Sequence, residues 1–272
     1  MTAFQTAEPP FLFHQGTRPL LVSIPHMGTH IPPALAARFT PAGRLVADTD
    51  WHLDLLYAFA VDMGASVLRA THSRYVIDIN RPPDGASLYP GRSVTGLCPV
   101  DTFLYEPIYA DAADQPGEAE IAARRAAIWQ PYHDKLAAEL ARIRAAHGVA
   151  MLWDAHSIHP VLPRFFDGRL PDLNLGTAQG TSCAPGLGER LLALAQAEPG
   201  YTSVLNGRFT GGYITRHHGR PASGIHVVQL EMAWSCYMQL EAPFAYLPET
   251  AARVQPLLRR MLGAMLEFAQ AQ

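Results

Sequence analysis

The 272-residue sequence lacks most of the patterns that mark exported or cysteine-stabilised proteins. It has only three cysteines, Cys98, Cys183 and Cys236, and no C-x-x-C pair, which argues against a disulfide framework and against a cysteine-based zinc site. The first residues contain no charged segment followed by a long apolar one, and no later run approaches 18 apolar residues. We therefore expect a soluble cytoplasmic protein with reduced thiols and no membrane partner.

Strong charge is also absent. The chain has 21 basic and 24 acidic residues, which give a formal net charge of −3, and the two signs are interspersed without a basic cluster. Nucleic-acid-binding surfaces and surfaces that bind anionic membranes are normally basic, so the composition argues against both. A small molecule is the expected partner, and no sequence pattern indicates an oligomeric state.

What the sequence does contain is apolar residues, 49% of the total, in runs that alternate between two periodicities. That amount supports one sizeable core, and we expect residues 1–272 to form a single domain. Strands are expected at 20–24, 66–70, 75–79, 149–153 and 225–230, and helices at 49–63, 118–147 (interrupted at Pro131 and closed by Gly148), 187–197 and 248–269. This order predicts an α/β fold with a mostly parallel or mixed central sheet and helices on both faces.

Two of the expected strands lead into histidines. The run 20–24 continues into Pro25 and His26, and the run 149–153 continues into Asp154 and His156. Ligands of open α/β sheets bind at the carboxyl ends of the strands, so both imidazoles are expected to bind one metal ion there. Asp154 is placed to orient one of the rings. The alternative is that both are hydrogen-bonded histidines of the core.

A catalytic zinc site usually has three protein ligands, and the third is expected to be Asp50. It stands at the entrance of the helix predicted over 49–63. Asp48 and Asp54 remain alternatives, because they lie on either side of Asp50, and Asp48 is equally well placed to cap the helix. The long loops 82–107 and 159–186 are expected to form the walls of the site.

Glu231 follows the apolar strand predicted at 225–230 and is expected to act as the general base. A carboxylate at the end of a buried strand seldom adds stability, because an unpaired buried charge is costly. A structural ion pair with an arginine is the alternative.

Cationic side chains suited to an acidic substrate occur in two places. Asn80 and Arg81 end the strand predicted at 75–79, and a guanidinium group matches a carboxylate bidentately. Arg74 is expected to stabilise an oxyanion or to pair with Asp78.

The second place is the glycine-flanked segment 210–219. It is expected to be a mobile lid, or else a solvated hairpin. As a lid it would carry Arg216 to a substrate carboxylate and His217 to the developing negative charge.

At the level of motifs, the chain resembles the N-formylglutamate amidohydrolases, also called N-formylglutamate deformylases, over nearly its whole length. The resemblance is carried by SIPHMGTHIP, DTDWHLDLLY, SRYVIDINRPP, TGLCPVDTF, YHDKLAAEL, LWDAHSI, FDGRLPDLNLGT, FTGGYITRHHG and QLEMAWSCYM. It implies a zinc-peptidase-like (phosphorylase/hydrolase-like) α/β fold, one divalent ion, most simply Zn²⁺, and hydrolysis of N-formyl-L-glutamate to glutamate and formate as the last step of a histidine degradation route.

The resemblance also implies roles for individual residues. His26 and His156 would bind the metal, Glu231 would correspond to the peptidases' general base, and Asn80 with Arg81 would correspond to their carboxylate-binding pair. One departure is that Thr29 stands where carboxypeptidase-type sites commonly have the glutamate of a His-x-x-Glu pair.

In the mechanism expected from these residues, a metal-activated water attacks the formyl carbon. Glu231 takes the water's proton and passes it to the departing nitrogen. A related amidohydrolase that acts on another N-acyl amino acid or a small peptide is the alternative enzyme, and a non-catalytic binding protein is the alternative from another class. The histidines outside the predicted site, among them His72 and His133, are expected mostly at the surface or at caps.

Overall fold

A seven-stranded mixed sheet forms the centre of the molecule in the computed structural model, which describes residues 4, 6–88 and 91–271. The strands are β1 (Phe11–His14), β2 (Leu20–Ile24), β3 (Ser66–Ala70), β4 (Ala150–Ile158), β5 (Leu173–Gly176), β6 (Ser203–Leu205) and β7 (Ile225–Ala233). Their order is β1-β3-β2-β4-β7-β5-β6. The central strands β3, β2, β4 and β7 are parallel, whereas β1 pairs antiparallel with β3, and β5 pairs antiparallel with β7.

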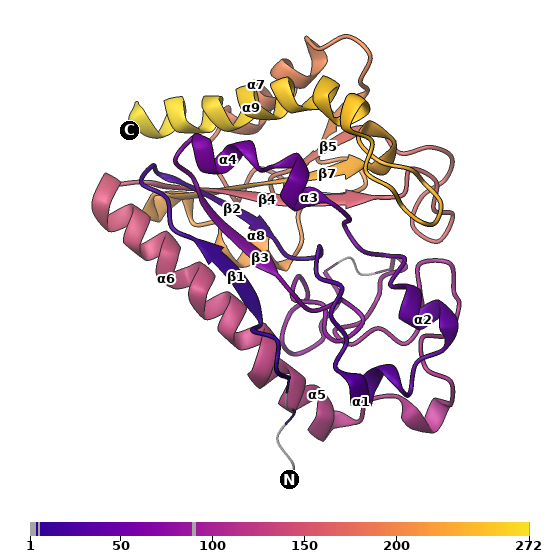
Figure 1. The fold of residues 1–272 in the computed structure, drawn as a ribbon. Helices are drawn as coiled ribbons and strands as arrows, with labels where there is room; N and C mark the ends of the chain where they lie inside the picture. The colour runs from indigo at the N-terminus through magenta and orange to yellow at the C-terminus, as the bar shows by residue number, and fades with distance from the viewer. Residues whose placement is uncertain (1–3, 5, 89–90, 272) are drawn as a thin grey trace.

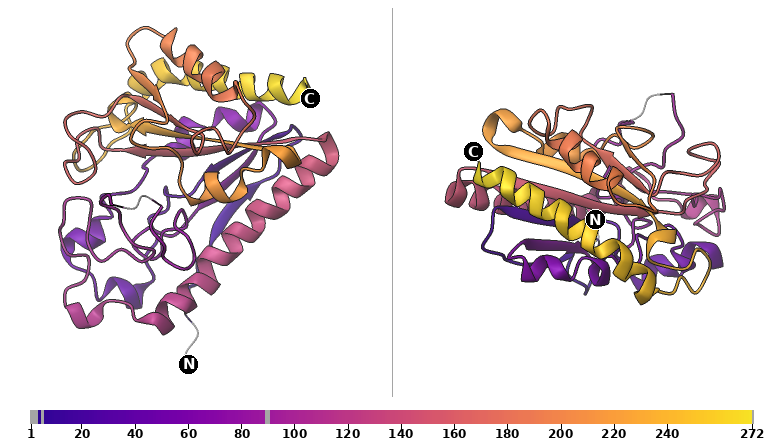
Figure 2. Two further views of the ribbon diagram at one scale, coloured as in Figure 1. Left: turned by 180° about the vertical axis from the view of Figure 1, so that it is seen from behind. Right: turned by 90° about the horizontal axis from the view of Figure 1, so that it is seen from above.

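Helices cover both faces of this sheet, as the sequence predicts (Figures 1 and 2). The α-helices are α1 (Pro33–Ala36), α2 (Pro41–Leu45), α3 (Leu53–Leu56), α4 (Phe59–Asp62), α5 (Glu118–Arg124), α6 (Gln130–His147), α7 (Leu187–Gln196), α8 (Tyr213–His218) and α9 (Pro248–Gln270). Helices α4, α7 and α9 lie on one face, and α6 and α8 lie on the other. No helix in the described part of the chain is both long and apolar enough to cross a membrane.

The two-residue periodicity of the strands sends side chains alternately into two apolar clusters, one on each side of the sheet. On β2, Leu20 and Val22 join the cluster beneath α9, whereas Leu21 joins the cluster beneath α6. On β4, Trp153 joins the cluster beneath α9, and Leu152 joins the cluster beneath α6. Because both faces are buried, these strands read as continuous apolar runs in the sequence.

Several predicted elements are confirmed. Strands β2 and β3 have the predicted bounds, and α7 and α9 differ from prediction by one residue. The long helical stretch ends at Gly148, whose φ of 80° suits a residue without a side chain. The interruption lies upstream of the predicted position, in a wider π turn over Arg125–Trp129, whereas Pro131 lies in the first turn of α6, where its missing N–H group is tolerated.

Three expected elements are wrong. The helix predicted over 49–63 is two short helices, α3 and α4, preceded by a turn in which His52 has a φ of 58°. The strand predicted at 75–79 is a buried turn, because both neighbours of β3 are already β1 and β2. The predicted lid at 210–219 contains α8, whose Ile214 and Thr215 are buried against the sheet. Residues 89 and 90 of the predicted loop 82–107 lie outside the described residues.

Candidate active site

The register of the parallel strands brings the site together. Within the β4–β7 ladder, His156 lies directly beside Glu231, and Asp154 lies beside Gln229. Strand β2 pairs with the other edge of β4 and ends at Ile24, so that His26 follows two residues beyond it. Both predicted histidines and the predicted base therefore meet at the carboxyl ends of three adjacent strands.

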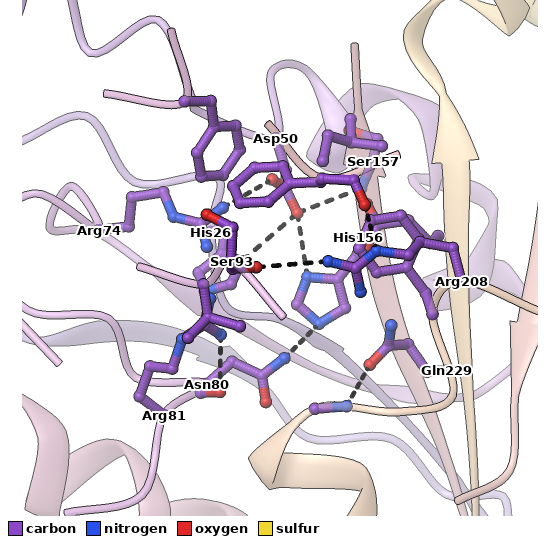
Figure 3. Close-up of a pocket in the computed structure, with 17 residues that line it drawn as sticks. His26, Asp50, Arg74, Asn80, Arg81, Ser93, His156, Ser157, Arg208 and Gln229 are labelled. Atoms are coloured by element: carbon purple, nitrogen blue, oxygen red, sulfur yellow. Dashed lines mark hydrogen bonds and ion pairs between the residues drawn. The ribbon is translucent and has the colours of Figure 1, made fainter. Parts of the chain in front are cut away.

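Asp50 completes a group of three possible metal ligands. Its backbone N–H donates to the carbonyl oxygen of His26 at 3.0 Å, which holds the turn after α2 against the end of β2. The Asp50 Oδ2 atom lies 3.7 Å from His26 Nδ1 and 3.1 Å from His156 Nδ1. One ligand atom from each of the three residues lies within 4.8 Å of the others, and all three side chains are buried (Figure 3).

The other nitrogen of each imidazole faces a carboxylate. His26 Nε2 donates to Asp78 Oδ1 at 2.7 Å, and His156 Nε2 lies 3.3 Å from Asp154 Oδ1. This arrangement orients the rings so that both Nδ1 atoms face Asp50, as expected for metal-binding histidines that are held by carboxylates. Asp154 thus lies where the sequence predicts it. The sequence predicts Asp78 only as a partner of Arg74, so its contact with His26 is an addition from the structure.

The electrostatics of this group suit a cation. Burial and Arg74 lower the pKa of His26, whereas Asp154 and Asp50 raise the pKa of His156 well above its ordinary value in spite of its burial. Four buried carboxylates, of Asp50, Asp78, Asp154 and Glu231, share the site with the guanidinium groups of Arg74 and Arg81. The residues therefore fit a divalent ion, which supplies the missing positive charge and takes two imidazoles and a carboxylate as ligands.

Glu231 lies on the wall of the same cavity, with 8% of its surface exposed. Burial raises the pKa of its carboxyl group, and the negative charges of Asp50 and Asp154 add to this rise, whereas the positive charges of His156 and Arg74 oppose it. The strand continues to Ala233, so Glu231 lies within β7 rather than beyond its end. Gln229, two residues before Glu231, also lines the cavity. Side chains two residues apart on a strand lie on the same face, so the spacing from Glu231 could have indicated Gln229 from the sequence.

The two alternatives to Asp50 have other partners. Asp48 Oδ2 accepts hydrogen bonds from the Tyr75 hydroxyl at 2.6 Å and from the Phe103 N–H at 2.8 Å, so it neither caps a helix nor joins the triad. Asp54 lies in the first turn of α3, where it pairs with Arg69 at 3.7 Å. A turn at Trp51 and His52 separates Asp50 from α3, so Asp54 and Asp50 do not lie on one helix.

On the loop side of the cavity, Arg74 lies within 2.7 Å of Asp78 and 3.9 Å of Asp50, and its guanidinium stacks on Phe103. Both interpretations of Arg74, as a partner of Asp78 and as a cation facing the site, are thus compatible with its position. Arg81 lines the cavity and donates to the Thr95 carbonyl and hydroxyl oxygens at 2.9 and 3.0 Å.

Asn80 also lines the cavity, but its side chain connects two structural elements. Its Nδ2 lies 3.0 Å from His156 Nε2, and its Oδ1 accepts the N–H of Ile214 in α8 at 2.8 Å. A Cβ atom at Gly212 would lie 2.2 Å from Asn80 Nδ2, so only glycine allows α8 to begin this close. Asn80 therefore lies between a candidate ligand and the start of α8.

Arg216 and His217 do not reach the cavity, which corrects the predicted placement. Both are exposed on α8. Arg216 donates to the Gly211 carbonyl and the Thr210 hydroxyl, and His217 stacks on Tyr213. The helix turns these side chains outward and buries its opposite face on the sheet.

The cavity is walled by the two loops that the sequence singled out. Ser93 and Val94 come from the first, and Phe165 comes from the second. Arg208 and Phe209, from the segment between β6 and α8, complete the wall and were not predicted. No local pattern marks Arg208, which is surrounded by loop residues in the sequence.

The remaining histidines include a buried pair, His133 and His218. His133 of α6 donates from Nε2 to the Ile79 carbonyl at 2.8 Å, and its Nδ1 lies 3.2 Å from Nε2 of His218. Burial lowers the pKa of His133 to about 4 and that of His218 to about 2. His72 is also buried, next to His30. The expectation of surface positions is wrong for His133 and His72.

The chain is similar to known proteins in both sequence and fold. Residues 18–238 match the family model described as N-formylglutamate amidohydrolase. The chain is 47% identical over 258 residues to a Pseudomonas aeruginosa protein and 49% identical over 256 residues to a Pseudomonas putida protein, both named N-formylglutamate deformylase. These alignments cover 95% of this chain and 96% of the first relative, and 94% of this chain and 95% of the second.

A solved structure agrees with these matches. The crystal structure of N-formylglutamate amidohydrolase from Ralstonia eutropha JMP134 superposes with a TM-score of 0.82 at 26% identity, and covers 97% of this chain and 99% of that one. With a family model and two relatives matched over most of its length, the chain belongs to the N-formylglutamate amidohydrolase family.

Proposed function

We propose that this protein is a metal-dependent N-formyl-L-glutamate deformylase, which hydrolyses its substrate to L-glutamate and formate. The observation that carries the proposal is the 47–49% identity, over nearly the whole chain, to two proteins with that name. The three strands that supply the site, β2, β4 and β7, belong to one sheet and come from the first and the last part of the chain. This arrangement supports a single catalytic domain over residues 1–272.

His26, Asp50 and His156 are the residues proposed to hold the metal. Two imidazoles and one carboxylate form a ligand set common in catalytic zinc sites, so Zn²⁺ is the proposed ion. When bound, such an ion supplies Lewis acidity that polarises a carbonyl group and makes a water molecule more acidic. Asp78 and Asp154 lie beside the outer ring nitrogens, and both Nδ1 atoms face Asp50, so both would be available to a bound ion.

Glu231 is the proposed general base. Its position beside His156 on the adjacent strand places a carboxylate next to the proposed ligands. Glu231 accepts the proton of the attacking water and then donates it to the amide nitrogen of glutamate, which leaves as an amine. Arg74, held by Asp78, faces the site with a fixed positive charge that stabilises the negative charge developing on the formyl oxygen. Arg81 is proposed to bind a substrate carboxylate.

Formate release tests this proposal directly. The purified protein is assayed with N-formyl-L-glutamate and, as a matched control, with N-acetyl-L-glutamate. We expect rapid formyl-selective turnover, loss of turnover with a chelator, and recovery when zinc is added back. Faster release of acetate than of formate would instead support an amidohydrolase of another N-acyl amino acid. Turnover that survives complete metal removal would contradict the proposed metal dependence.

A further inference from the structure

The proposed substrate carries two carboxylates, so its site needs two cationic receptors at different distances from the scissile bond. The α-carboxylate is attached to the carbon that bears the reacting nitrogen, whereas the side-chain carboxylate is two methylene groups further away. Arg81 suits the nearer group, because it follows Asn80, which contacts His156, and lies 3.6 Å from Asp78. A receptor for the farther carboxylate has to lie elsewhere on the cavity wall.

Arg208 lies on that wall. In the view of Figure 3, Arg208 is drawn on one side of the His156 ring and Arg81 on the other. The segment that carries it lies between β6 and α8, so Arg208 and Arg81 approach the cavity from different parts of the chain. A molecule that contacted both would extend across the triad, with its amide bond above the proposed ligands.

The contacts of Arg208 hold it in one orientation. Its Nε donates to the Phe165 carbonyl at 2.5 Å, and its Nη2 lies 3.4 Å from the Ser93 carbonyl oxygen. Both carbonyls belong to the loops that wall the cavity, and together they orient the guanidinium. A rotamer fixed in advance reduces the entropy that is lost when a ligand binds.

The surroundings of Arg208 are apolar. Its guanidinium lies 5.9 Å from the centre of the Phe165 ring and 5.2 Å from that of Phe209, and both rings line the cavity. Aromatic walls lower the local dielectric constant, which strengthens an ion pair formed there. They also offer a packing surface to the two methylene groups of a glutamyl side chain.

We infer that Arg208 is a specificity-determining residue that binds the side-chain carboxylate of an acidic N-formyl amino acid, while Arg81 binds the α-carboxylate. This inference rests on the proposed function and assigns the second carboxylate to a residue other than Arg216, which is exposed on α8. A site that forms a charge-assisted pair with a carboxylate discriminates against the matching carboxamide, because the amide leaves the guanidinium without its anion.

The test compares N-formyl-L-glutamate with N-formyl-L-glutamine, which differ only in that group. In Arg208→Met we expect kcat/KM for N-formylglutamate to fall about 100-fold, while kcat/KM for N-formylglutamine changes less than about 5-fold. Arg208→Lys keeps the charge but not the planar fork, so it should lose selectivity to an intermediate degree. Arg169→Met, which removes an exposed arginine held by Asp172, is the matched control and should leave both values unchanged.

Inhibition supplies a readout that does not need turnover of the amide. Glutarate, with two carboxylates, should inhibit Arg208→Met about 100-fold more weakly than the unmodified protein, whereas butyrate, with one, should inhibit both equally. Equal losses on both substrates, or an unchanged inhibition constant for glutarate, would show that Arg208 only supports the loops and would overturn the inference. So would loss of selectivity in Arg216→Met but not in Arg208→Met. If the unmodified protein releases no formate from N-formylglutamate, the proposed function itself is what fails.

Discussion

The two sides of the cavity are built in different ways. The strand side carries His26, His156 and Glu231 at the ends of β2, β4 and β7, where neighbouring ladders determine the position of each side chain. The loop side carries Arg81 and Arg208 on segments without regular secondary structure. On the strand side the relative positions follow from backbone pairing, whereas on the loop side they follow from individual side-chain contacts.

This difference explains which predictions succeeded. A strand continues in the direction its hydrogen bonds impose, so a histidine just past its end can be located from the sequence. The direction of a loop depends on contacts such as that between Asn80 and Ile214, which joins residues far apart in the chain. The proposed roles divide in part along the same line: the strand side carries two proposed metal ligands and the base, whereas the loop side carries the arginines proposed to bind the substrate, together with Arg74 and Asp50.

The largest effect is expected from removing a proposed ligand on the strand side. His156→Ala removes one of three metal-binding atoms and leaves Asp50 and Asp154 without the ring between them. We expect loss of both bound metal and formate release, measured by elemental analysis and by the formate assay on the same sample. If the variant keeps its full metal content, the metal site does not lie at this triad.

Glu231→Gln is expected to separate metal binding from chemistry. The substitution keeps the size of a side chain next to His156 but removes the group that accepts a proton. Metal content should stay at the level of the unmodified protein, while kcat falls by about 10²–10⁴-fold. Retention of full activity would exclude Glu231 as the base and would leave the strand side without its proposed proton carrier.

A smaller effect is expected where the two sides meet, at Asp78. Burial alone would raise the pKa of this carboxyl, but the charges of Arg81, His26 and Arg74 hold it well below its ordinary value. Asp78→Asn should weaken metal binding by about 10–100-fold, because His26 loses the carboxylate that orients it. Competition with a metal-sensitive dye measures this change.

Asp48→Asn is the matched control for that experiment. Asp48 is also a buried aspartate on the loop side, but it contacts Tyr75 and Phe103 rather than a histidine. Its metal affinity should match that of the unmodified protein. Equal weakening in both variants would indicate a general loosening of the loops rather than a role for Asp78 in orienting His26.

The smallest effect is expected at the buried pair His133 and His218. His133 supports the loop side through its hydrogen bond to the Ile79 carbonyl. The pKa values of both are depressed by burial, to about 4 and about 2, so below pH 6.5 the unfolded chain binds protons that the folded chain does not. This pair therefore contributes full stability above pH 6.5 and progressively less as the pH falls toward 4.

His218→Gln removes one of these titrations while keeping a hydrogen-bond donor beside His133. The free energy of unfolding of the variant should fall less steeply between pH 6.5 and 4.5, by up to about 1.4 kcal/mol per pH unit. Urea unfolding at several pH values measures the slope. Parallel slopes for the two proteins would mean that His218 does not contribute to the acid sensitivity.

Local patterns in the sequence were enough for the central part of the site. The apolar runs of β2, β4 and β7 are long enough to be recognised without neighbours, and their order implies parallel pairing with a ligand site at the carboxyl ends. That reasoning placed His26, His156 and Glu231 together, and the motif resemblance indicated the family that the comparisons support.

Other features depended on the tertiary structure. The apolar run at 75–79 reflects burial but not pairing, because a strand also needs a free neighbouring edge, and both edges of β3 are occupied by β1 and β2. The glycines of 210–219 indicate freedom of the backbone, yet the contacts of Asn80 and Gln229 with the start of α8 settle it into a helix that turns Arg216 outward.

What the sequence by itself determined is thus the chemistry carried by each strand end, because side-chain direction along a strand alternates regularly and depends only on neighbours in the chain. Only the tertiary structure decided that Asp50, rather than Asp48 or Asp54, lies beside both imidazoles, and that Arg208 lines the cavity. Those outcomes depend on contacts between residues distant in the chain, such as Asp48 with Phe103 and Arg208 with Phe165, which no local pattern encodes.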